Sequence, residues 1–88
     1  MDTDTILREV NRIFIDVLDN DAIVLTRDTT AKDVEDWDSL NHIQLVVAIE
    51  KSFKVRFTTN EIRAWKNVGD MCEALYAYLS SNKGWARQ

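Results

Sequence analysis

The absence of proline is the feature that most restricts how this chain can fold. Its 88 residues include no proline and only two glycines, Gly69 and Gly84. Chains of short strands depend on tight turns rich in these two residue types, so the composition favours helices joined by polar loops. The length suffices for one domain with a single modest core. We therefore predict an all-α domain over residues 1–82, followed by a frayed tail over residues 83–88.

Apolar residues recur at helical spacing along most of the chain. The pattern predicts a four-helix bundle. Three long helices are expected over residues 4–18, 39–53 and 67–80, and one short helix is expected within residues 54–66. Thr58-Thr59-Asn60-Glu61 matches a capping box that would start the short helix. Thr3 or Asp4 is expected to cap the first helix. The expected core is Ile6, Val10, Ile13, Phe14, Val17, Leu25, Leu45, Val46, Ile49, Phe53, Phe57, Ile62, Val68, Met71, Leu75 and Leu79.

A long connection over residues 19–38 joins the first two predicted helices. Loops of this length are uncommon in a small domain and are usually functional or anchored by their own side chains. Residues 23–25 are apolar and are expected to fold back onto the bundle. Val34 and Trp37 are the expected anchors of the remaining, acidic part.

Charge is distributed unevenly along the chain, whose net charge is −4. Residues 1–50 carry twelve acidic and four basic residues, whereas residues 51–88 carry three acidic and seven basic residues. Binding to nucleic acid is disfavoured because phosphate contacts need clustered lysine and arginine. A protein partner with a basic patch suits the acidic connection better.

The sequence shows no sign of export or of membrane insertion. No apolar run approaches the length of a membrane span, and the first residues lack the layout of a signal peptide. Cys72 is the single cysteine, so no internal disulfide can form. We expect a monomeric protein of the cytoplasm.

Ser39 lies where the acidic connection gives way to the second predicted helix. The first turn of a helix has backbone N–H groups without intrahelical partners, and the helix dipole is positive there. An anionic group attached to the serine oxygen would therefore be stabilised. We take Ser39 as a point of covalent attachment and not as a catalytic nucleophile.

The helix predicted over residues 39–53 is more apolar than a surface helix needs to be. One apolar stripe is expected to face the core, and consists of Leu45, Val46, Ile49 and Phe53. A second stripe is offset around the helix axis, and consists of Leu40, Ile43 and Val47. An apolar stripe that the core does not need is expected to serve a partner.

Catalytic and metal-binding alternatives have weaker support. His42 follows Ser39 by three residues, so a serine–histidine pair is geometrically possible, but no Gly-x-Ser-x-Gly motif is present. We interpret His42 as an exposed histidine on the helix surface. One histidine, one cysteine and scattered carboxylates give no metal-ligand spacing. An unmodified helical interaction protein, docking through the second stripe, stays open as an alternative function.

Asp38-Ser39-Leu40, followed by an apolar helix, resembles the acyl carrier protein family of phosphopantetheine-binding domains. The resemblance covers nearly the whole chain and includes residues 48–57 and 67–71. It implies that a separate Mg²⁺-dependent phosphopantetheinyl transferase attaches 4′-phosphopantetheine from coenzyme A to Ser39, with Asp38 assisting that chemistry. The thiol of the arm would carry an acyl or aminoacyl group as a thioester between loading and transferring enzymes. The protein itself would not be an enzyme.

The resemblance also implies roles for residues around the serine. The partner-facing residues would be Leu40, Ile43, Gln44, Val47 and Glu50, and the acyl pocket would be lined by Phe57, Ile62 and Trp65. Asn41, Gln44 and Lys51 stand where many fatty-acid carriers have acids, so docking to a basic patch is expected to be weaker. Trp65 is bulkier than the aliphatic residue usual in the family. These departures favour a specialised carrier of short or polar cargo.

Overall fold

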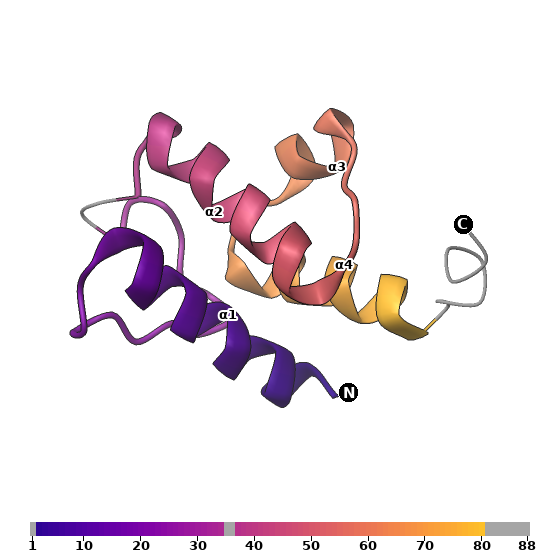
Figure 1. Cartoon of the computed structure of the whole chain (residues 1–88), viewed down its shortest axis with the longest axis horizontal. Coiled ribbons are helices and arrows are strands. Elements are labelled where there is room, and N and C mark those ends of the chain that lie inside the picture. Colours follow the sequence, from indigo (N-terminus) through magenta and orange to yellow (C-terminus); the bar gives the residue numbers. More distant parts are fainter. Residues whose placement is uncertain (1, 35–36, 81–88) are drawn as a thin grey trace.

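The structure is a computed structural model of the chain, and it describes residues 2–34 and 37–80 apart from the side chain of Ser39 (Figure 1). It contains four helices, which are α1 (Thr3–Leu18), α2 (Ser39–Phe53), α3 (Thr59–Ala64) and α4 (Val68–Ser80). The predicted all-α class is confirmed, and the predicted bounds of the second helix are those of α2. The tail predicted over residues 83–88 lies outside the described residues.

The helix α1 contacts both α2 and α4, and the short α3 lies on the side of α2 away from α1 (Figure 1). Side chains from all three long helices are fully buried between them, among them Ile6, Phe14, Leu45, Ile49, Met71 and Leu75. Four residues of the predicted core are only half-buried: Val17, Phe57, Ile62 and Leu79. Among the described residues, no helix is long and apolar enough to cross a membrane.

Side-chain caps start the first three helices. Asp2 caps α1 by accepting a hydrogen bond from the Thr5 N–H at 2.8 Å. The expectation that Thr3 or Asp4 would do so is wrong, because both residues already lie within the helix. The capping box of α3 is present as predicted from Thr58.

The side chain of Asn11 holds the connection between α1 and α2 to α1. Asn11 donates from Nδ2 to the Ile23 carbonyl at 3.2 Å, and its Oδ1 accepts from the Leu25 N–H at 2.6 Å. Ile23 and Leu25 are buried, as predicted, but Val24 between them is 81 % exposed. Successive side chains thus alternate between the core and solvent, and only the outer two reach the core.

The same connection is tied to the start of α4 by its backbone. The Val68 N–H donates to the Thr29 carbonyl and the Gly69 N–H to the Arg27 carbonyl, both at 2.8 Å. A β-carbon at Gly69 would lie 2.8 Å from the Arg27 oxygen. This close approach of two backbones requires glycine at position 69.

Aromatic and polar contacts attach the short α3 to α4. The Phe57 ring packs edge-on against Trp65, with centroids 4.8 Å apart, and against Tyr78 at 5.4 Å. The Tyr78 hydroxyl donates to the Glu61 carboxylate, with 2.8 Å to each oxygen. This hydrogen bond raises the pKa of Tyr78. The pKa of Glu61 is lowered by the Thr58 backbone N–H and then by Tyr78.

Candidate attachment site and adjoining cavity

The N-terminus of α2 is built on Asp38. Its backbone is extended, its Oδ1 accepts from the Asn41 N–H at 2.8 Å, and its carbonyl accepts from the His42 N–H at 2.8 Å. Ser39 is the first helical residue and therefore lies at the positive end of the helix dipole. A phosphodiester attached at this position fits the site, because helix N-termini stabilise anions. The predicted exposure of the Ser39 hydroxyl lies outside what the structure describes.

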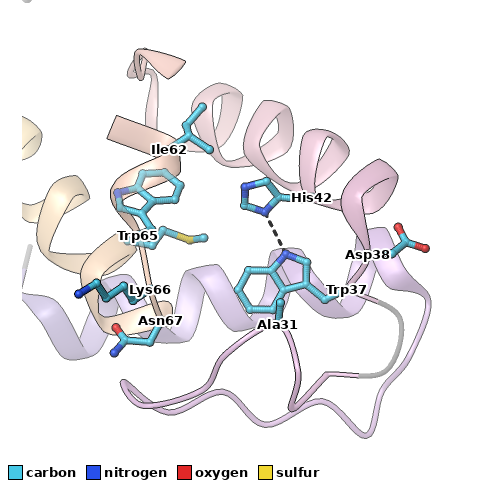
Figure 2. Close-up of a pocket in the computed structure, with 9 residues that line it drawn as sticks. Ala31, Trp37, Asp38, His42, Ile62, Trp65, Lys66 and Asn67 are labelled. Carbon is cyan, nitrogen blue, oxygen red and sulfur yellow. Dashed lines mark hydrogen bonds between the residues drawn. The ribbon is translucent and has the colours of Figure 1, made fainter. Parts of the chain in front are cut away.

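Trp37 and His42 form a pair across the start of α2. The indole Nε1–H donates to His42 Nδ1 at 3.0 Å, and the two rings stack with an interplanar angle of 23° (Figure 2). Trp37 also packs edge-on against the buried Phe14, with centroids 4.9 Å apart. Our interpretation of His42 as an exposed surface histidine is therefore wrong. Its ring is half-buried against the end of the connection.

The protonation of His42 follows from this contact. The indole Nε1–H of Trp37 can only donate a hydrogen bond, so Nδ1 of His42 must accept it and carries no hydrogen. The imidazole ring is therefore neutral, with its hydrogen on Nε2. Burial lowers the pKa of His42, in the same direction. The side chain therefore serves to fix Trp37 beside the attachment site.

A cavity of about 500 Å³ opens between the start of α2 and the segment from α3 to α4. Trp37 and His42 line one side, and Ile62 and Trp65 face them from the other (Figure 2). Asp38 also lines the cavity, although its carboxylate is turned away from the facing rings (Figure 2). Among the residues expected to form an acyl pocket, Ile62 and Trp65 thus line one cavity. Phe57 does not line it.

Four further residues complete the lining of the cavity. They lie on the connection and around the start of α4, and are Ala31, Lys66, Asn67 and Met71. None of these residues was predicted from the sequence to line the cavity, and neither was Trp37 or His42. Asn67 also caps α4, because its Oδ1 accepts from the Asp70 N–H at 2.9 Å. The walls are consequently mixed, with apolar surface from the indoles, Ile62 and Met71 and polar groups from His42, Lys66 and Asn67.

The second apolar stripe of α2 lies on the surface. Leu40 is 67 % exposed, Ile43 is 63 % exposed and Val47 is 43 % exposed, and Gln44 is exposed beside them. Leu45, Val46 and Ile49 face the interior, as predicted. The two stripes of α2 therefore have different roles, and only one of them is used by the core.

Glu50 differs from the other residues predicted to face a partner. It is half-buried, and its Oε2 accepts from the Phe57 N–H at 2.8 Å. This bond satisfies a backbone donor of the segment between α2 and α3. Glu50 therefore supports the fold directly, and its carboxylate is engaged before any partner arrives.

The remaining candidates for chemistry are inert in this arrangement. Cys72 is buried, and desolvation raises the pKa of its thiol to about 11, so it is not a ready nucleophile. Within residues 2–34 and 37–80, no group of three histidine, cysteine, aspartate or glutamate side chains could hold a metal ion. The chemistry of the site therefore centres on the start of α2.

Known proteins are similar to this chain over most of its length. A family model described as the phosphopantetheine attachment site matches residues 8–75. The chain belongs to the acyl carrier protein family. This carrier is also similar to the solution NMR structure of a holo acyl carrier protein from Geobacter metallireducens, with 40% identity and a TM-score of 0.83. The match covers 89% of this chain and 90% of that chain. No match was found among curated proteins.

Membership in the family determines the general function. The protein is a carrier that bears covalent 4′-phosphopantetheine and is not itself an enzyme. A carrier of this type interacts with a phosphopantetheinyl transferase and with acyl-handling enzymes. The interpretation as an unmodified interaction protein is not favoured.

The His42 contact predicts how stability depends on pH. Burial lowers the folded-state pKa below the ordinary 6.5, so in acid the unfolded chain takes up the proton first. The free energy of unfolding should therefore fall as the pH drops below about 6.5, because protonation then favours the unfolded chain. His42→Gln keeps a hydrogen-bond acceptor for Trp37 but does not titrate. Urea unfolding from about pH 7.5 to about pH 5.5 should show a smaller loss in the variant than in the parent. Equal losses would contradict the role assigned to the Trp37–His42 contact.

Proposed function

We propose that Ser39 carries the 4′-phosphopantetheine arm and that its thiol holds an acyl or aminoacyl group as a thioester. The observation that carries this proposal is the place of Ser39 as first residue of α2, between the capping Asp38 and the exposed Leu40. This position lies within the span matched by the family model. The serine oxygen would form a bond to the phosphorus atom that carries the pantetheine arm, and the bond from this phosphorus to the nucleotide part of coenzyme A would break. The product is a phosphodiester with one negative charge.

The geometry around Ser39 suits that product. The phosphodiester would lie at the positive end of a helix of 15 residues, an arrangement that contributes about 0.3–1 kcal/mol to a nearby anion. The arm would start beside both the apolar strip (Leu40, Ile43 and Val47) and the cavity lined by Trp65. Modification, docking and cargo shelter would thus share one side of the molecule.

We assign docking to partner enzymes to the apolar strip, and binding of the acyl or aminoacyl group to the cavity. The strip would pack against the loading and transferring enzymes. Gln44 lies at the margin of the strip and would contact the same enzymes. The mixed walls of the cavity, with Trp65 facing His42, support a short or polar cargo over a long alkyl chain. We further propose that the protein works as a monomer in the cytoplasm, which fits its single unpaired cysteine.

Loading with coenzyme A tests the attachment site. Incubation with coenzyme A, Mg²⁺ and a phosphopantetheinyl transferase should add the mass of one phosphopantetheine to the parent chain. Ser39→Ala should gain nothing, because the receiving hydroxyl is gone. Ser52→Ala, at the other end of α2, is the matched control and should gain as the parent does. Intact mass spectrometry gives the answer, and an equal gain in Ser39→Ala would refute the assignment.

Asp38 has two proposed roles that substitution can separate. Asn and Asp cap helices about equally well, so Asp38→Asn should unfold within about 0.5 kcal/mol of the parent. It lacks the carboxylate that we propose assists the transferase, so its initial rate of loading should fall by roughly tenfold or more, since a charged group contributes on this scale. Asp38→Ala should lose the cap as well, at about 1 kcal/mol. Loading of Asp38→Asn at the parent rate would limit Asp38 to capping.

A further inference from the structure

The C-terminal end of α2 presents a cluster of positive charges, here called the basic end, which consists of Lys51, Lys54 and Arg56. All three side chains are exposed. In the part of the chain that the structure describes, none of them pairs with an acidic side chain. Their charges are therefore available to a partner.

The basic end continues the apolar strip. Lys51 follows Val47 by four residues on the same face of α2, and Lys54 is the C-cap residue at the end of the helix, so the strip runs into the basic end. A groove of about 730 Å³ lies here, and its lining residues are Val47, Val55, Tyr78, Glu50 and the three bases. Apolar and cationic groups thus meet in one concave surface.

Acidic residues neutralise this surface only in part. The four acids between residues 39 and 80 are all engaged within the protein: Glu50 with the Phe57 N–H, Glu61 with Thr58 and Tyr78, Asp70 with the Lys66 N–H, and Glu73 with Arg27. Among the described residues, Glu50 is the one acidic residue that lines the groove, and the three bases outnumber it, although the whole chain carries a net charge of −4.

Helix stabilisation alone does not account for the basic end. Lysine near a helix C-terminus complements the dipole, which explains Lys51 and Lys54. It does not explain Arg56, which lies beyond the end of α2, or the apolar groove that Arg56 borders.

We infer that the groove at the basic end receives an acidic amphipathic segment of a partner enzyme. Apolar residues of that segment would cover Val47, and its carboxylates would face Lys51, Lys54 and Arg56. The inference rests on the proposed docking role of α2 and refines it. With Asp38 at one end of the docking face and the basic end at the other, opposite charges would fix the direction in which a partner lies along α2.

Two synthetic helical peptides test this inference on the full, unmodified chain. Both carry one row of leucines, and the flanking positions are all glutamate in one peptide and all lysine in the other. Fluorescence anisotropy at low salt should show the glutamate peptide binding roughly tenfold more tightly. The preference should shrink at about 0.5 M salt, where exposed charges are screened. The net negative charge of the chain favours the lysine peptide, so the test is stringent.

Matched charge reversals locate the effect. Lys51→Glu combined with Arg56→Glu should remove or invert the preference, whereas Arg8→Glu combined with Lys32→Glu makes the same change in net charge elsewhere and should preserve it. If circular dichroism shows that the first pair fails to fold, Lys51→Gln with Arg56→Gln takes its place. Ser39→Ala should keep the full preference, so failure of phosphopantetheine loading and failure of this inference are separate results.

Three outcomes would overturn the inference. They are equal binding of the two peptides, tighter binding of the lysine peptide, and no binding of the glutamate peptide up to about 1 mM. Sedimentation with phosphatidylserine vesicles covers a different partner. Vesicle binding that the Lys51 and Arg56 substitutions abolish, without binding of the glutamate peptide, would assign the basic end to a membrane surface and contradict a protein partner.

Discussion

Two backbone hydrogen bonds between the long connection and the start of α4 hold together the part of this carrier that contains the cavity beside α2. The first two N–H groups of α4 would otherwise lack partners, and they bond to the carbonyls of Thr29 and Arg27. The connection is thereby fixed to a helix that lies far along the chain. Gly69 makes the contact possible, because a side chain there would collide with the Arg27 oxygen. The cavity beside α2 exists because the connection and the start of α4 are held at this separation.

The end of the connection then positions α2. Trp37 packs on the buried Phe14 and donates to His42, and the next residue, Asp38, caps the helix. The first turn of α2 is therefore fixed from the core side by aromatic contacts and from its end by a carboxylate. Ser39, the proposed attachment point, follows directly and is held by its neighbours in sequence. The outer face of α2 takes no part in these contacts and can present the apolar strip and the basic end to partners.

Local patterns predicted the parts of this arrangement that depend on neighbouring residues. The bounds of α2, the capping box at Thr58 and the division of α2 into a buried and an exposed stripe all follow from spacing and side-chain type. Contacts between distant segments left no such signal. Asn11 bonds to the backbone of the connection, and Glu50 bonds to the Phe57 N–H. Each bond joins a helix to an irregular segment, whose sequence has no repeating pattern from which the contact could be predicted. The Trp37–His42 pair was missed because Trp37 precedes the helix, so its spacing from His42 does not follow the helical repeat.

The central claim is that a preformed scaffold presents Ser39 and that modification acts only on the side of the molecule around it. Amide and indole NMR spectra of the ¹⁵N-labelled chain, before and after loading with phosphopantetheine, test it most directly. We expect shifts at residues 38–42 and at the indole N–H groups of Trp37 and Trp65, with α1 and the second half of α4 unchanged. Shifts spread along α1 and α4, or none at residues 38–42, would contradict it.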